Sequence, residues 1–439
     1  MKTRPNSDKR VNIITLGCSK NTVDSEVILT QLRGNGIEAM HESGKGAEVV
    51  IINTCGFIDN AKEESINTIL GYSEEKSAGR IEKLFVTGCL SERYRQELQS
   101  EIPGIDGWFG TTDLPALLKK FNADYKKELL GERMTSTAPH FAYLKISEGC
   151  DRPCSFCAIP LMRGKHKSRS LESLVEESQW LVRRGVKEII LIAQDLTYYG
   201  LDIYGKRELN ELLKRLSDVD GLKWLRLHYA FPSGFPVEIL QTIRERENIC
   251  NYIDIPLQHI SDRMLKSMRR GINKEKSLEL VRRIREDVPG IAIRTTMIAG
   301  YPGETQADHE EQLQFIRDMR FERLGVFTYS HEEDTHAFTL DDDVPAEKKT
   351  ERLNRIMETQ QEISLENNRN LLGRTMKVLL DRKEGEFFFG RTEMDSPEVD
   401  NEVMLTGNGM EVGEFYDVRI TDATEYDLQG ELNSEVQIS

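Results

Sequence analysis

Short apolar runs alternate with helical patterns along most of this chain, and this alternation is the feature that most restricts its fold. Residues 11–17 (VNIITLG), 49–54 (VVIINT) and 83–88 (KLFVTG) have the composition of buried strands, and a helical pattern follows each of them. Strands and helices that alternate over short connections form a parallel sheet covered by helices. The sequence therefore predicts an N-terminal parallel α/β sheet domain over residues 1–130.

A second series of strands follows the polar stretch 131–140 (GERMTSTAPH), which is typical of a linker. Six apolar runs predict its strands: YLKIS, EIILIAQD, LKWLRLH, YIDIPLQ, AIRTTMIAG and RLGVFTYS. Six such units suggest an open (β/α)6 partial barrel, over residues 141–370, rather than a complete eight-stranded one. A long charged helical pattern from Pro345 to about Leu372 is expected to act as a brace or connector.

The tail, residues 371–439, consists of short apolar runs (TMKVLLD, GEFFFGRT, EFYDVRIT) separated by glycine turns, which predicts a small all-β barrel. It contains 6 Lys and Arg against 16 Asp and Glu, so it accounts for ten of the fifteen net negative charges. A barrel that binds RNA is expected to be basic, whereas an acidic one suits a basic protein partner. The alternative is a charged surface that serves solubility alone.

The bulk composition is that of a globular protein, with 38% hydrophobic and 30% charged residues and a mean hydropathy of -0.49. No apolar run approaches the roughly 20 residues needed to cross a bilayer, and the basic N-terminal stretch lacks an apolar run of signal-peptide length behind it. The net charge of -15 argues against general affinity for nucleic acid. We therefore expect a cytoplasmic protein without membrane contacts, and nothing in the sequence demands more than a monomer.

Three of the seven cysteines, Cys150, Cys154 and Cys157, have CxxxCxxC spacing directly after the strand YLKIS. Three thiolates on one tight loop can bind three irons of a 4Fe-4S cluster, and the fourth iron is then open to the amino and carboxylate groups of S-adenosylmethionine. The alternative is structural zinc with His166 or Cys250 as fourth ligand, but zinc sites usually have two CxxC-like pairs. The position at the head of a βα barrel, where active sites collect, favours the cluster.

Three further cysteines, Cys18, Cys55 and Cys89, each follow a predicted parallel strand of the N-terminal domain. The carboxyl ends of these strands meet at one edge of the sheet, where open α/β sheets place their ligands. Buried core thiols are the alternative. Convergence at strand ends, each beside a glycine, favours a second three-thiolate cluster, whereas Cys250 lacks such a context and is expected to be an inert buried thiol. The glycines concerned are Gly17, Gly56 and Gly88.

Other polar positions are expected at the mouth of the central barrel. In the turn AGYPGETQAD (299–308) glycines allow close backbone approach, so Gly300, Gly303 and Glu304 are predicted to contact the cofactor, together with Gln194. A turn without any role in cofactor binding would have the same sequence pattern. Three further strand-end residues could line the pocket or pack as ordinary neighbours: Asp195, His228 and Gln258. The basic loop 162–169 predicts a solvated face or, less often, a contact with a carboxylate substrate.

Several motifs resemble the methylthiotransferase family of radical S-adenosylmethionine enzymes over nearly the whole chain: LGCSKNTVDSE, INTCGFIDNAKEES, YLKISEGCDRPCSFCAIPLMRG, LIAQDLTYYG and YIDIPLQH. Within the family they resemble the RimO branch. The tRNA-modifying MiaB branch typically has GCQMN instead of GCSKN, and Gln-Asn instead of Gln194-Asp195. The resemblance implies a cysteine-bearing N-terminal domain, a radical SAM domain and a C-terminal TRAM-like domain.

The resemblance also implies an activity, namely addition of a methylthio group to the β-carbon of an aspartate in small-subunit ribosomal protein number twelve. It implies two 4Fe-4S clusters, held by the six cysteines named above, and S-adenosylmethionine. The implied partners are this basic ribosomal protein, a sulfide source and a low-potential electron donor such as flavodoxin or ferredoxin. The nearest alternative is the same chemistry on a tRNA adenosine; a non-catalytic zinc-binding RNA adaptor is an alternative of a different class.

Overall fold

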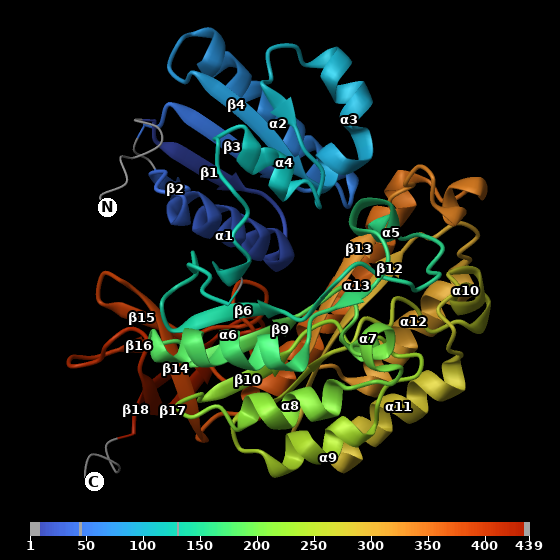
Figure 1. Ribbon diagram of the computed structural model, residues 1–439. Helices are drawn as coiled ribbons and strands as arrows, with labels where there is room; N and C mark the ends of the chain where they lie inside the picture. Colours follow the sequence, from blue (N-terminus) through green and yellow to red (C-terminus); the bar gives the residue numbers. More distant parts are fainter. Residues whose placement is uncertain (1–8, 44–45, 130, 434–439) are drawn as a thin grey trace.

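The computed structural model describes residues 9–43, 46–129 and 131–433 (Figure 1). Most of the basic N-terminal stretch, residues 1–8, lies outside the described residues, as does the extreme C-terminus. The chain forms an N-terminal α/β unit, a central α/β unit and a C-terminal β-barrel. Among the described helices, none is both long enough and apolar enough to cross a membrane.

The described N-terminal residues form a parallel sheet of five strands in the order β2-β1-β3-β4-β5. The strands are β1 (Val11–Thr15), β2 (Ala39–His41), β3 (Val49–Thr54), β4 (Lys83–Gly88) and β5 (Gly107–Trp108). The helices are α1 (Ser19–Gly34), α2 (Asp59–Ser77), α3 (Cys89–Glu101) and α4 (Leu114–Lys119), followed by the short turn η1 (Lys127–Leu129). β3 is buried along its whole length because helices cover both faces of the sheet, which confirms the predicted α/β arrangement.

Between residues 131 and 370 six parallel strands form an open sheet in the order β13-β12-β11-β10-β9-β6, so the predicted (β/α)6 fold is confirmed. The strands are β6 (Phe141–Lys145), β9 (Glu188–Ile192), β10 (Trp224–Leu227), β11 (Ile249–Asp254), β12 (Ala292–Ala299) and β13 (Arg323–Thr328). A small antiparallel hairpin, β7 (Ser147–Glu148) and β8 (Lys167–Ser168), closes the loop after β6.

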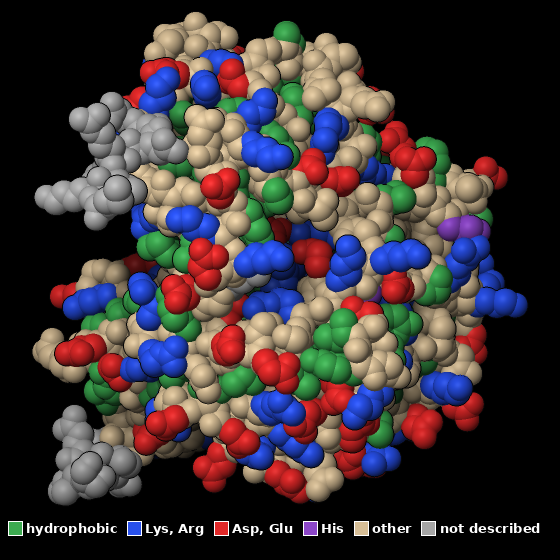
Figure 2. Space-filling view, viewed as in Figure 1, with side chains coloured by type: hydrophobic (Ala, Val, Ile, Leu, Met, Phe, Trp, Pro, Cys, Tyr) green, Lys and Arg blue, Asp and Glu red, His purple; other side chains and the backbone are tan. Residues whose placement is uncertain are grey.

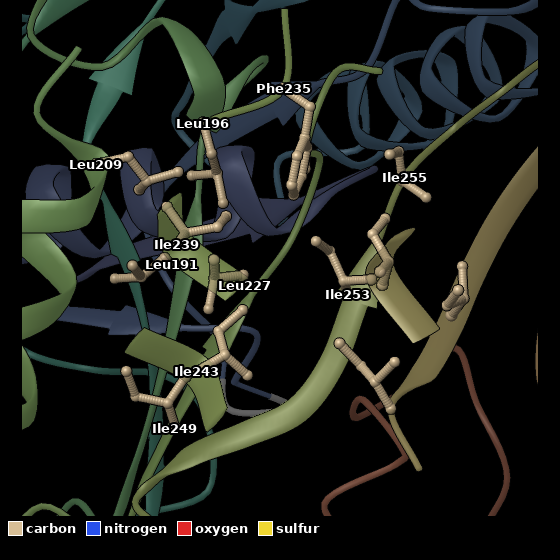
Figure 3. Close-up of a cluster of buried hydrophobic side chains, with 14 of the residues drawn as sticks. Leu191, Leu196, Leu209, Leu227, Phe235, Ile239, Ile243, Ile249, Ile253 and Ile255 are labelled. Carbon is tan, nitrogen blue, oxygen red and sulfur yellow. The ribbon is translucent and has the colours of Figure 1, made fainter. Parts of the chain in front are cut away.

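The helices of the central unit are α5 (Ile159–Arg163), α6 (Leu171–Arg183), α7 (Leu201–Tyr204), α8 (Leu209–Ser217), α9 (Glu238–Glu245), α10 (Asp262–Ser267), α11 (Lys274–Asp287) and α12 (Gln306–Met319), with the turns η2 (Leu196–Tyr198) and η3 (His336–Thr339). Of these, α6, α8, α9, α11 and α12 cover one face of the central sheet. Leucines of α8 recur at helical spacing and therefore share one buried face. Figure 3 shows side chains of α8 and α9 in one cluster with Leu227 and Ile253 of the sheet. Each such side chain contributes about 1.5–3 kcal/mol through burial.

The opposite face of the central sheet packs in part against the C-terminal barrel and in part against α1 of the N-terminal unit. Since strand side chains alternate between faces, this face carries a row of charged residues. Arg226 of β10 pairs with Glu188 of β9 at 2.7 Å, and Glu188 also accepts from Arg391 at 2.8 Å. Arg323 of β13 reaches Asp395, in the segment 392–402 that joins two barrel strands, at 2.8 Å. These buried ion pairs fix the barrel against the sheet.

The described C-terminal residues form a closed barrel in the order β14-β15-β16-β18-β17, which matches the predicted small all-β barrel. Its strands are β14 (Thr375–Glu384), β15 (Phe387–Arg391), β16 (Val403–Thr406), β17 (Phe415–Ala423) and β18 (Leu428–Leu432). The long helix α13 (Ala346–Arg369) joins it to the central unit. Gln360 of α13 donates to the carbonyl of Phe321 and Ser364 to that of Glu425, so α13 holds both units at once.

The stretch 131–140 contains no helix or strand but is not solvated throughout. Arg133 is 2% exposed and pairs with Glu26 of α1 and, at 3.1 Å, with Glu177 of α6. Its guanidinium also donates to the carbonyl of Tyr143 in β6. The connection therefore ties the N-terminal unit to the central one.

Candidate active site

The CxxxCxxC loop lies at the carboxyl end of β6 and is folded tightly. The amide of Cys150 donates to the carbonyl of Gly164 at 3.1 Å, and the amide of Cys157 to the carbonyl of Cys154 at 3.3 Å. Gly149 has a φ of +76°, and a Cβ there would lie 2.2 Å from the carbonyl oxygen of Lys165. Only glycine fits this close backbone approach. The loop brings three free thiols together on one short segment.

Arginine and apolar groups surround this loop. Arg270 donates to the sulfur of Cys154 at 3.2 Å and also binds the carbonyl of Pro256. Phe156, between the second and third cysteines, packs against an apolar cluster that includes Tyr301. Burial raises the pKa of the Cys150 thiol to about 11 and that of Cys157 to about 12. Since metals bind the thiolate, occupation of this site by iron must release protons.

The other three cysteines converge at the carboxyl ends of β1, β3 and β4, which are neighbours in the sheet. Cys18 caps α1, Cys55 follows β3 directly, and Cys89 is the first residue of α3. A Cβ at Gly17 would lie 2.8 Å from the sulfur of Cys55, so the loop after β1 crosses this side chain closely. Burial raises the pKa of Cys89 to about 12, Arg163 lowers it, and the charges of the other two thiols raise it further. The three thiols therefore lie within mutual electrostatic reach.

Arg163 connects the two cysteine sites. It lies in α5, six residues after Cys157, yet donates to the sulfur of Cys89 at 3.2 Å. The same guanidinium binds Asp24 at 2.6 Å and Asn21, both in α1. Cys89 also packs against α5, which lies just below α3 in Figure 1. The two sites are thus neighbours, and the basic loop 162–169 is not simply a solvated face, because Arg163 within it is buried.

The donor set of each site fits an iron–sulfur cluster. No three His, Cys, Asp or Glu side chains in the described ranges are placed to hold a single metal ion. A four-iron cluster takes each thiolate on a different iron, so its ligands need not converge on one point. Of the two residues considered as a fourth zinc ligand, His166 bonds to Ser168 at 3.0 Å, and Cys250 is fully buried among aromatic side chains of the barrel interface.

Gln194 and Asp195 follow β9 and differ in what they contact. The amide nitrogen of Gln194 donates to Glu148 at 2.9 Å, whereas its oxygen is buried and accepts no hydrogen bond from the described residues. Asp195 is fully buried and binds Arg152, the residue two after Cys150, at 2.7 Å. Asp195 therefore orients the cysteine loop, and Gln194 retains an acceptor for a ligand.

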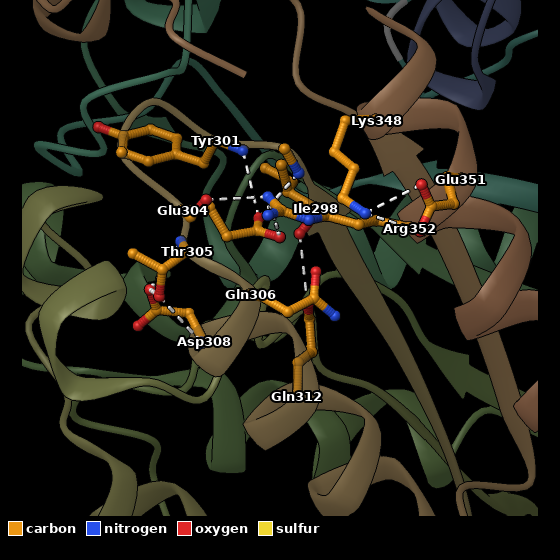
Figure 4. Close-up of polar contacts among 12 residues, drawn as sticks. Ile298, Tyr301, Glu304, Thr305, Gln306, Asp308, Gln312, Lys348, Glu351 and Arg352 are labelled. Carbon is orange, nitrogen blue, oxygen red and sulfur yellow. Dashed lines mark hydrogen bonds and ion pairs between the residues drawn. The ribbon is translucent and has the colours of Figure 1, made fainter. Parts of the chain in front are cut away.

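The glycine turn after β12 is stabilised by hydrogen bonds to Glu304, a residue of the turn itself (Figure 4). Glu304 is 4% exposed and accepts from the amide of Gly300 at 2.7 Å. It also pairs with Arg352 of α13 at 3.0 Å, and the amide of Gly303 donates to Asp343. The Glu304 carboxylate thus shapes the turn, and the amides of Gly300 and Gly303 are engaged in holding it.

Two other predicted pocket residues are largely enclosed. His228 is buried and bonds through Nε2 to Ser396 of the C-terminal segment at 2.7 Å; burial lowers its pKa well below the ordinary range. Gln258 has a left-handed backbone and a buried side-chain oxygen that lacks a partner among the described residues. Sequence reasoning missed Arg152 and Arg270 and considered Arg163 only as part of the basic loop 162–169, because no spacing rule connects these arginines with their distant partners.

A hollow lies between the N-terminal unit and the central sheet, and Figure 2 shows charged side chains gathered there. It contains a cavity of about 220 Å³ bounded by α1, β6 and α6. Its charged lining residues are Asp24, Arg133, Lys145, Arg169 and Glu177.

Comparison with known proteins first defines the class. Residues 10–110 match the "Uncharacterized protein family UPF0004", residues 144–316 the radical SAM superfamily and residues 372–432 the TRAM domain. The radical S-adenosylmethionine methyltransferase TsrM from Kitasatospora setae, solved with cobalamin and a 4Fe-4S cluster, has a TM-score of 0.53 at 17% identity, covering 73% of this chain and 75% of TsrM. OxsB, a cobalamin-dependent radical enzyme, has a TM-score of 0.52 at 12% identity, covering 80% and 56%. These structures share the fold of a radical SAM enzyme.

Closer relatives define the family. A protein of Cytophaga hutchinsonii named ribosomal protein uS12 methylthiotransferase RimO is 59% identical over 98% of this chain and 100% of its own length. One of Bacteroides fragilis with the same name is 51% identical over 97% and 99%. The chain belongs to the RimO family of radical S-adenosylmethionine methylthiotransferases.

Proposed function

We propose that this chain adds a methylthio group to the β-carbon of an aspartate in ribosomal protein uS12. The observation that carries the proposal is the pair of three-cysteine sites joined by Arg163, since a radical step and a sulfur transfer require two centres side by side. The named relatives support uS12 as substrate. The acidic C-terminal barrel supports a basic protein rather than RNA.

In this proposal Cys150, Cys154 and Cys157 hold one 4Fe-4S cluster, and Cys18, Cys55 and Cys89 hold the other. When bound, the clusters and S-adenosylmethionine supply the deoxyadenosyl radical, the sulfur and the methyl group. The sequence regions divide accordingly, with residues 1–130 carrying the second site, 141–370 the first, and 371–439 contacting substrate.

The chain's own residues orient and shield these groups. Arg270 and Arg163 each donate to a cysteine sulfur and offset negative charge on the thiolates. The side-chain oxygen of Gln194 is available to the amino group of S-adenosylmethionine. The turn that contains Gly300 and Gly303, shaped by Glu304, follows β12 directly and would lie against the adenosine. A flavodoxin- or ferredoxin-like donor and a sulfide source would act on this monomer in the cytoplasm.

The test begins with the protein reconstituted under anaerobic conditions. We expect about eight irons per chain, four for each cluster, and about four in a variant with Cys18, Cys55 and Cys89 changed to Ala. Cys250→Ala, the matched control, should keep the full content, because Cys250 lies in the barrel interface.

Activity is then measured with uS12, S-adenosylmethionine and a reductant. Wild type should increase the mass of uS12 by one methylthio group, and Cys154→Ala should form no 5′-deoxyadenosine. Zinc without iron, or methylthiolation of a tRNA adenosine instead of uS12, would overturn the proposal.

A further inference from the structure

We propose that Lys20 is a carboxylate-binding residue that holds the side chain of the substrate aspartate between the two cysteine sites. The inference rests on the proposed function and deepens it by naming what recognises the target residue. Lys20 lies two residues after Cys18, in the first turn of α1. Its ammonium lies 3.1 Å from the ring centroid of Tyr229, which follows β10.

Lys20 is a buried cation without a counter-ion. It is 8% exposed, and no carboxylate within the described parts of the chain forms an ion pair with it. Three other cations that reach α1 differ in this respect: Arg133 pairs with two glutamates, and Lys145 and Arg163 each pair with Asp24. An unpaired buried ammonium is costly, so such a group is expected to meet its partner in the complex.

The ring of Tyr229 satisfies this ammonium only in part. A cation over an aromatic face gains roughly 0.5–2 kcal/mol, but the ring provides no acceptor comparable to a carboxylate for the three N–H donors of a lysine. The ammonium therefore retains the capacity for charge-assisted hydrogen bonds to an incoming carboxylate.

The position of Tyr229 places this cation at the mouth of the central sheet. Tyr229 has a φ of +64°, a left-handed conformation that is uncommon for a bulky residue. Its amide donates to Asp254 at 3.2 Å and its carbonyl accepts from Leu196, so both backbone groups are fixed. Strain of this kind collects at functional sites. Lys20 extends from the N-terminal unit toward this fixed ring, so a carboxylate bound there would lie where the first turn of α1 meets the central sheet.

A single lysine at this point selects aspartate over asparagine. The two side chains have nearly the same shape, and only the carboxylate has the charge that the ammonium requires. Charge-assisted hydrogen bonds to a buried group correspond to about ten- to hundredfold in affinity. Asparagine, whose side chain is an uncharged amide, is expected to lose most of this gain in affinity.

The test measures binding of labelled uS12 to the reconstituted holoenzyme, for wild type and Lys20→Met. Each is titrated with uS12 and with uS12 in which the target aspartate is replaced by asparagine. Wild type should bind the aspartate form about ten- to hundredfold more tightly, and Lys20→Met should bind both forms equally. Lys20→Arg should restore part of the preference, because it restores the charge. Lys83→Met, at an exposed position at the start of β4, is the matched control and should behave as wild type.

Iron content separates this role from a structural one, since Lys20→Met keeps the apolar stem of the side chain and should leave the iron content unchanged. Loss of iron in Lys20→Met would assign Lys20 to the cluster site and overturn the inference, as would an undiminished preference for aspartate. If wild type leaves uS12 unmodified, the proposed function itself fails; if wild type modifies uS12 and Lys20→Met keeps the preference, only the role of Lys20 fails.

Discussion

Replacing Arg163 by Gln should loosen the contact between the N-terminal unit and the cysteine loop of the central unit. The wild-type guanidinium is 6% exposed, binds Asp24 at 2.6 Å and Glu148 at 3.3 Å, and donates to Cys89. Burial lowers its pKa, but the charges of Asp24, Cys89 and Glu148 outweigh burial and raise the pKa well above the ordinary value. The arginine is therefore always charged, and the glutamine removes a full charge.

The expected loss of stability in Arg163→Gln depends on which ion pairs the carboxylates that bind Arg163 retain. Removing one member of a buried ion pair costs about 3–5 kcal/mol when the other charge is left alone. Here Asp24 and Glu148 both retain Lys145, so we expect the lower value of about 2–3 kcal/mol that applies to charge-assisted hydrogen bonds. The loss should be confined to docking of the N-terminal unit, because Arg163 makes no contact with the C-terminal barrel among the described residues.

Hydrogen exchange of the backbone amides in α1 and α3 measures this docking directly. Exchange there should accelerate about 30- to 160-fold in Arg163→Gln, which corresponds to about 2–3 kcal/mol, while exchange in β14–β18 stays unchanged. The iron that we propose for the N-terminal site should also be lost faster to a chelator. Arg283→Gln, which breaks only an exposed pair with Asp287, is the control. Unchanged exchange in α1 would refute the role given to Arg163.

Three further perturbations have defined outcomes. Gly88→Ala should cost about 1–3 kcal/mol and lower the iron content of the N-terminal site, because φ is +98° and a Cβ would lie 2.5 Å from the Thr54 carbonyl; iron analysis and urea unfolding test this. Leu227→Ala should destabilise the central unit by about 2–5 kcal/mol in urea by leaving a cavity in the cluster of Figure 3, with normal unfolding as the contrary result. Burial lowers the pKa of His259 to about 3, so below about pH 6.5 the unfolded chain binds a proton at this residue that the folded chain does not bind. The free energy of unfolding therefore decreases as the pH is lowered, by about 2 kcal/mol between pH 7 and pH 5. His259→Asn should remove this part of the slope between pH 7 and pH 5, and an identical slope would contradict it.

The sequence predicts the interior of the two sheets better than their edges. The runs 49–54 and 83–88 coincide with β3 and β4, because a strand that is buried on both faces consists of a nearly continuous run of apolar residues. The edge strands β2 and β5 have three and two residues and were missed, since so short a segment carries no periodicity. The barrel strands β16 and β18 were missed for a related reason, as their pairing depends on closure of the whole barrel.

The same contrast holds for the candidate site. The spacing of Cys150, Cys154 and Cys157 is local and can be seen in the sequence. The contact between Arg163 and Asp24 joins residues 139 positions apart, and that between Arg270 and Cys154 joins residues 116 apart. Such pairs exist only after the units have docked, so no local pattern indicates them.

The segment 392–402 gives the C-terminal barrel a second part to play. It packs against the face of the central sheet that the helices do not cover. In a complete eight-stranded barrel the two additional strands would help to enclose this face, and here the segment helps to enclose it instead. A C-terminal unit that packs against the central sheet in this way cannot be removed without exposing that part of the sheet to water. Truncation after residue 370 is therefore expected to impair the radical chemistry itself, and not only the capture of substrate.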